Sequence, residues 1–196
     1  MRSGKITRII LILGVILILG ALLITLVPMV SQKVASSKNV EILERMNLLL
    51  PEVRAGVYDD RVDVDMPSAE IDGMNFVGII EIPLHDVKLP IYASWDSSKV
   101  GRFPCRYMGS IYDGSLIIGG SDSADQLDFS KTISIGDAVF VTDMTGARYS
   151  YKVTWVKLTD DVSTEQLIST EADLVLFVRN SYSLDYAVVS CDKYGK

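Results

Sequence analysis

The chain has 196 residues, of which 48% are hydrophobic, and its mean hydropathy of +0.28 is high for a protein that is soluble throughout. Two cysteines and one histidine are too few for a zinc site or a small disulfide-stabilised scaffold, so we expect no metal and no cofactor. The formal net charge of −6 argues against nucleic acid as a partner.

One uncharged apolar block stands near the N-terminus. Residues 9–30 are mainly Ile, Leu and Val, and about 22 such residues can cross a bilayer core of roughly 30 Å as a helix. Arg2, Lys5 and Arg8 precede the block without any acid, so the positive-inside rule keeps residues 1–8 in the cytoplasm. The sequence predicts a single-pass anchor in the cell membrane with the C-terminal domain extracellular. The alternative, a cleaved signal peptide, usually has a shorter apolar region of about 7 to 15 residues.

A helical segment and an acidic linker are predicted over residues 31–75. Apolar residues recur there at the three- and four-residue spacing of a helix, namely at Val40, Leu43, Met46, Leu49 and Leu50. Ser36 and Ser37 are candidate N-caps, and Pro51 is expected to end the helix. Residues 52–75 are acidic and turn-rich, which predicts a linker or an arm that lies along the surface.

Residues 76–196 are predicted to form a β domain. Short runs rich in β-branched and aromatic residues alternate with Gly, Pro, Asp and Ser, which is typical of a closed or sandwich-like β fold. The predicted strands are 76–82, 87–93, 115–118, 138–143, 149–158, 174–178 and 186–191. Met144-Thr145-Gly146 predicts a hairpin turn, and one helical turn is expected between residues 167 and 173.

Five motifs occur in a fixed order within this domain. They are Gly78-Ile79-Ile80-Glu81-Ile82-Pro83, Leu89-Pro90-Ile91-Tyr92, Leu116-Ile117-Ile118-Gly119-Gly120, Phe129 followed by Gly136-Asp137, and Leu174-Val175-Leu176-Phe177. The order resembles that of the sortases, the cysteine transpeptidases that join surface proteins to the Gram-positive cell wall or to one another as pili. The resemblance implies a mainly β protein with a sortase-like closed β-barrel of about seven or eight strands and short helices, preceded by an N-terminal transmembrane helix.

The same resemblance implies that the three catalytic residues of the family are replaced. Ser121 stands where the family has the histidine of I-A-G-H, and Arg179 where it has the cysteine of L-T-L-F-T-C. Tyr186 stands where the family has an arginine. A guanidinium stays protonated and cannot be a nucleophile, and a hydroxyl has no pKa near neutrality to shuttle a proton.

The groove candidates are therefore Ser121, Asp122, Arg179 and Tyr186, with no catalytic residue among them. If Arg179 projects toward Asp122, the two side chains form a charge-assisted pair that fills the groove. The alternative is that Arg179 points to solvent from the end of its strand.

The two cysteines, Cys105 and Cys191, leave two alternatives open. They pair as a disulfide, which persists outside the cell, or they remain separate thiols. Neither fits the vacated nucleophile position, because Cys191 lies at the far end of the next strand and Cys105 has no histidine partner in sequence. The one histidine, His85, falls in the turn between the first two strands, where a surface or turn role is expected.

We therefore expect a membrane-anchored extracellular sortase-like protein that acts as a non-catalytic binding or accessory factor in surface-protein or pilus assembly. Its expected partners are the membrane and an extended sorting-signal-like peptide, a pilin or an active sortase. One alternative is an active cysteine transpeptidase or peptidase that uses Cys105 or Cys191. Another is a structural component of a membrane complex, which an exposed hydrophobic face on the helix over residues 40–50 would favour.

Overall fold

The computed structural model describes residues 14, 16–18, 38–57, 65–122, 126–127, 132–180, 183 and 185–194. The chain divides into two compact units, Met1–Lys38 and Asn39–Lys196. Most of the apolar block 9–30 lies outside the described residues, so the membrane anchor stays a prediction. Within the described part of the chain, no helix combines the length and the apolar character needed to span a membrane.

The second unit is mainly β and begins with a helix over residues 39–49. The elements that follow are β1 (Arg54–Ala55), β2 (Ala69–Ile71), β3 (Met74–Ile82), the 3-10 helix η1 (Pro83–His85), β4 (Val87–Tyr92), β5 (Cys105–Met108), β6 (Leu116–Ser121), β7 (Ala138–Asp143), β8 (Ala147–Thr159), α2 (Thr164–Ile168), β9 (Leu174–Arg179) and β10 (Tyr186–Lys193).

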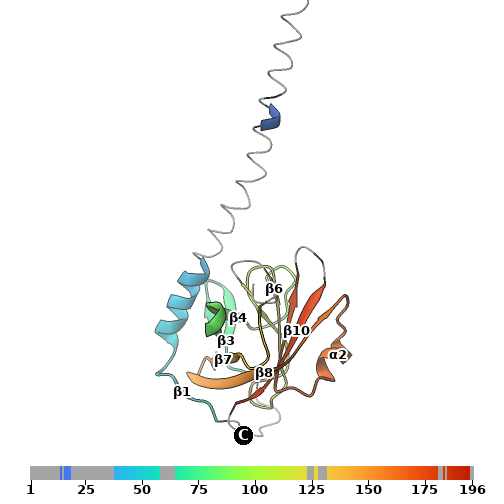
Figure 1. The fold of residues 1–196 in the computed structure, drawn as a ribbon. Helices are drawn as coiled ribbons and strands as arrows, with labels where there is room; N and C mark the ends of the chain where they lie inside the picture. The colour runs from blue at the N-terminus through green and yellow to red at the C-terminus, as the bar shows by residue number, and fades with distance from the viewer. Residues whose placement is uncertain are drawn as a thin grey trace, which may run out of the picture. The chain divides into compact units, whose positions relative to one another are not determined.

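Eight of the described strands close into a barrel. Their order around the barrel is β3, β4, β5, β6, β9, β10, β8 and β7, and β7 pairs again with β3. Figure 1 shows the long strands β8 and β10 of this barrel and the short helix α2 beside them. The strands β1 and β2 add to this ring at β8 and β3. The predicted closed barrel of seven or eight strands is confirmed, and the turn at residues 144–146 joins β7 to β8 as expected.

Three short strands and one helix differ from the sequence-based expectation. The patterns do not indicate β1, β2 or β5, which are only two to four residues long. Backbone hydrogen bonds from Arg54 N to Gly146 O (3.0 Å) and from Gly56 N to Arg148 O (2.7 Å) hold β1 along β8. The helical turn lies at α2, earlier than predicted, because Ser163 and Gln166 cap its start reciprocally.

Strand alternation separates the barrel interior from its outer face. Successive side chains of a strand point to opposite faces. In β9, Leu174, Leu176 and Val178 belong to the interior core, whereas Val175 and Phe177 pack in a second cluster on the outer face. The same alternation holds in β6 and β10, so every second residue of these three adjacent strands faces outward.

The helix over residues 39–49 packs on the barrel through one face. Ile42 and Met46 are buried against Phe76 and other residues of a third apolar cluster. Val40 and Leu49, which were expected on the apolar face, are 52% and 57% exposed. The three- and four-residue spacing therefore indicates the helix correctly but assigns these two residues to the wrong face.

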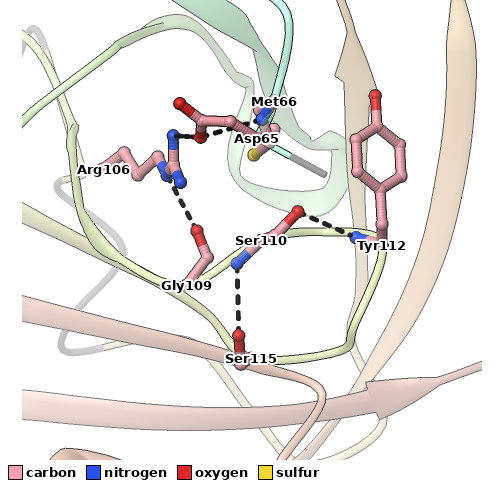
Figure 2. A network of polar contacts seen from close by, with 7 residues as sticks. All are labelled: Asp65, Met66, Arg106, Gly109, Ser110, Tyr112 and Ser115. Carbon is pink, nitrogen blue, oxygen red and sulfur yellow. Dashed lines mark hydrogen bonds and ion pairs between the residues drawn. The ribbon is translucent and has the colours of Figure 1, made fainter. Parts of the chain in front are cut away.

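A polar network fixes the chain before β2 to the barrel. Arg106 of β5 donates hydrogen bonds to Asp65 Oδ1 (2.6 Å) and to the carbonyl of Gly109 (2.8 Å), as Figure 2 shows. The hydrogen bond and the charge of Arg106 lower the pKa of Asp65. Next to it, Met66 is buried in the interior core. The segment predicted as a linker or surface arm is thus attached to the barrel in both halves, first through β1 and then through Asp65 and Met66.

Candidate functional site

Three of the four predicted groove residues meet at one end of the adjacent strands β6, β9 and β10. In the parallel pair of β6 and β9, Ser121 lies opposite Arg179. In the antiparallel pair of β9 and β10, Tyr186 lies opposite Arg179 from the other side. Phe177 lies two residues before Arg179 in β9, so both residues face outward from the barrel. The register therefore brings Ser121, Arg179 and Tyr186 together on the outer face of the barrel.

A pocket of about 490 Å³ opens at this place. Its volume falls in the range of roughly 300–1,000 Å³ that is typical of ligand sites. The strands and the loop after β4 share its lining, which consists of Trp95, Ser97, Val100, Gly101, Gly120, Ser121, Phe177, Arg179 and Tyr186. We call this the outer-face pocket.

An aromatic cluster forms one wall of the outer-face pocket. The ring centroids of Trp95, Tyr107 and Phe177 lie between 5.2 and 5.5 Å from one another, and Trp95 remains 41% exposed. Gly119 makes this arrangement possible, because a Cβ there would lie 2.4 Å from Phe177 and 2.5 Å from Trp95. A glycine in β6 thus lets two rings cover the strand and offer an apolar surface.

A buried glutamine joins the two sides of the outer-face pocket. Gln126 is 4% exposed and accepts a hydrogen bond from Ser121 N (3.2 Å) through Oε1. Its Nε2 donates to the carbonyl of Val100 (3.1 Å) in the loop after β4. Gln126 therefore holds that loop against the end of β6. No sequence motif points to this residue or to Trp95, because their roles depend on a loop that only the fold brings near.

The predicted ion pair between Arg179 and Asp122 is not found. Asp122 is 7% exposed and meets Arg179 through the backbone, where Asp122 N donates to Arg179 O (3.1 Å). Asp122 directly follows Ser121, and strand alternation turns its side chain away from the face that carries Ser121. Within the described part of the chain, the exposed guanidinium of Arg179 makes no ion pair or hydrogen bond. The predicted alternative, in which Arg179 points outward, therefore fits the structure.

Both cysteines are free and buried, so the disulfide considered from the sequence does not form in the structure. Burial raises the pKa of the Cys105 thiol to about 11 and also raises the pKa of Cys191. Cys191 belongs to the interior core and pairs with Leu174, at the opposite end of β9 from Arg179. Neither thiol lines the outer-face pocket.

His85 lies in η1, between the first two predicted strands as expected. Its Nε2 donates to Asp137 Oδ2 (2.9 Å), and its Nδ1 is hydrogen-bonded to the hydroxyl of Thr132 (3.1 Å). The hydrogen bond from His85 lowers the pKa of Asp137. His85 does not line the outer-face pocket. Among the described residues, no group of three or more His, Cys, Asp and Glu side chains could hold a metal ion.

Comparison with solved structures identifies the fold. Sortase A from Corynebacterium diphtheriae matches with a TM-score of 0.53 at 15% identity, over 84% of this chain and 85% of that one. Sortase C1 from Streptococcus agalactiae matches with a TM-score of 0.52 at 21% identity, over 65% and 72%. Sortase C from Clostridium perfringens, solved with the C-terminal cell wall sorting motif, has a TM-score of 0.50 at 18% identity, over 70% and 79%.

These likenesses confirm that the chain has the sortase fold, as its five motifs predict. No protein-family model matches the sequence, and no curated protein matches it either. At identities between 15% and 21%, the likeness concerns the fold alone.

Proposed function

We propose that this protein is a membrane-anchored, extracellular sortase-like protein that binds an extended peptide without cleaving it. The observation that carries the proposal is the lining of the outer-face pocket. Arg179 lies there between Ser121 and Tyr186, and the described lining residues include no thiol and no imidazole.

Acyl transfer of the sortase type needs a thiolate, a proton donor for the leaving amine and a cation for the oxyanion. Arg179 supplies a cation but no nucleophile, because its guanidinium stays protonated. Ser121 would need a general base to attack a carbonyl, and the described lining of the pocket contains none. This set of groups favours binding over turnover.

The shape and chemistry of the outer-face pocket suit a peptide. The aromatic wall of Trp95 and Phe177 offers an apolar surface for a side chain, and Ser97 and Tyr186 offer hydroxyls for a peptide backbone. A sortase C of the same fold was solved with the C-terminal cell wall sorting motif, so we propose a sorting-signal-like peptide as the ligand. An accessory role in surface-protein or pilus assembly, with a pilin or an active sortase as the partner, follows from that ligand.

The two alternative functions find less support. An enzyme using Cys105 or Cys191 would need an accessible thiolate, and both thiols are buried with raised pKa values. A contact helix would need one exposed apolar face. Val40, Leu48 and Leu49 are each more than half exposed. Since each residue of a helix turns by about 100°, Leu48 points about 80° and Leu49 about 180° away from Val40 around the helix axis. The three side chains therefore do not form one apolar face.

Mass spectrometry of the full-length protein, kept in a mild detergent and mixed with a library of sorting-signal-like peptides, tests the proposal. We expect intact peptide to be retained, with no cleaved product and no change after thiol alkylation. Trp95→Ala should weaken retention about tenfold, because it removes the aromatic wall. Leu84→Ala is the matched control, since Leu84 is an exposed apolar residue of η1 that does not line the pocket.

Two other outcomes would overturn the proposal. A cleaved peptide or a covalent acyl adduct would make the protein an enzyme and would identify the reacting residue. Absence of both binding and cleavage would remove the peptide-binding role and favour the structural component.

A further inference from the structure

The outer-face pocket contains hydrogen-bond donors for which the described residues supply no acceptor. The guanidinium of Arg179 carries five N–H donors, and none has a partner within the described residues. The hydroxyls of Ser97 and Tyr186 are likewise without a hydrogen-bond partner in the described part of the chain. These three side chains come from two strands and one loop and line a single pocket.

Among the described residues, no acidic side chain pairs with the charge of Arg179. Three acids stand next to lining residues in the sequence, but none of them lines the pocket. Asp96 accepts a hydrogen bond from Ser98 N (2.7 Å), Asp185 accepts one from the Ser183 hydroxyl, and Asp122 is buried. Arg179 is therefore the one charged side chain among the described residues that line the pocket, in a chain of net charge −6.

We infer that the outer-face pocket selects peptides that bring a carboxylate to Arg179. A carboxylate matches the planar fork of a guanidinium and accepts two parallel hydrogen bonds from it. The rings of Trp95 and Phe177 exclude water from one side, which strengthens such a contact. The inference rests on the proposed peptide-binding function and adds the chemical class of the ligand.

Two sources of the carboxylate have the same chemistry, namely the C-terminus of a peptide and an acidic side chain. Three pools of random N-acetylated pentapeptides distinguish them. The first pool has a free C-terminal carboxylate and no acidic residue, the second has a C-terminal carboxamide and one glutamate, and the third has a carboxamide and no acid. Equilibrium dialysis of each pool against the full-length protein measures retention at matched concentrations.

We expect the first or the second pool to bind at least about ten times more tightly than the third, and the better pool identifies the source of the carboxylate. Arg179→Gln should remove this preference, so that the first and second pools bind no more tightly than the third. Arg179→Lys should keep part of it, because the charge remains while the fork is lost. Lys152→Gln, at an exposed cation of β8 outside the pocket, should change nothing.

The contrary outcomes separate the two proposals. Equal retention of all three pools by the unaltered protein would overturn the carboxylate inference and leave peptide binding in place. A preference that survives in Arg179→Gln would also overturn it, because the anion would then be recognised elsewhere. Retention of no pool at all would overturn both the inference and the proposed function.

Discussion

Two charged residues of this chain, Asp143 and Arg179, lie in opposite surroundings. Asp143, at the end of β7, is fully buried and accepts hydrogen bonds from Thr145 N (2.8 Å), the Thr145 hydroxyl (2.7 Å), Ala147 N (3.0 Å) and the Tyr112 hydroxyl (2.8 Å). Arg179 is exposed at the outer-face pocket and has no partner in the described part of the chain. A buried charge must be satisfied by the protein, whereas a charge in an open pocket can be satisfied by a ligand. We therefore expect a structural role for Asp143 and a binding role for Arg179.

The largest loss of stability is expected when Asp143 is replaced. Asp143→Ala leaves four donors without their acceptor, three in the turn that joins β7 to β8 and one on Tyr112. We therefore expect the free energy of unfolding to fall by about 3 kcal/mol or more. Urea denaturation of the full-length protein measures the loss. Asp160→Ala, at an exposed aspartate beyond β8, is the control and should change stability by less than about 0.5 kcal/mol. A loss of under about 1 kcal/mol for Asp143→Ala would mean that this carboxylate is not a structural centre.

A smaller loss of stability is expected when Asp137 is replaced. The pKa of Asp137 is lowered chiefly by the hydrogen bond from His85. A lowered pKa in the folded state means that ionised Asp137 stabilises the fold above the unfolded pKa of about 3.9. That stabilisation disappears as the pH falls from there through the lower folded pKa. Asp137→Asn should therefore be less stable than the parent protein by about 1 kcal/mol at pH 7, and the difference should shrink below pH 4.

Denaturation curves at several pH values between 2 and 7 measure this difference, and Asp160→Asn provides a matched control. A stability difference that stays constant over the whole pH range would show that the ionisation of Asp137 does not contribute.

The barrel can be predicted from the sequence because its strands carry their own signal. The seven predicted runs correspond to β3, β4, β6, β7, β8, β9 and β10, which are long enough for alternation and β-branched composition to be seen. The strands β1, β2 and β5 give no such signal, since pairing with a neighbour rather than local composition makes them strands.

The residues of the candidate site also fall into two groups, those that the sequence motifs indicate and those that only the fold brings near. The motif order places Ser121 and Arg179 at strand ends, and the register then brings them together with Tyr186. Trp95 lines the outer-face pocket from a loop, and Gln126 is hydrogen-bonded to two of the lining residues, Ser121 and Val100. Nothing in the sequence pairs these two residues with distant parts of the chain. The sequence also suggests a bond between Arg179 and Asp122 because they are both charged and expected near the groove. Burial of the aspartate decides against that bond.

The smallest effect on stability is expected at Arg179, and it completes the comparison with Asp143. Arg179→Gln should change the free energy of unfolding by less than about 0.5 kcal/mol, because an exposed side chain without a protein partner contributes little to the folded state. The urea denaturation used for Asp143→Ala measures it under identical conditions. A loss of more than about 1 kcal/mol would make Arg179 part of the structural framework. A near-zero change in stability, together with a lost preference for carboxylate peptides, would assign the guanidinium to the ligand.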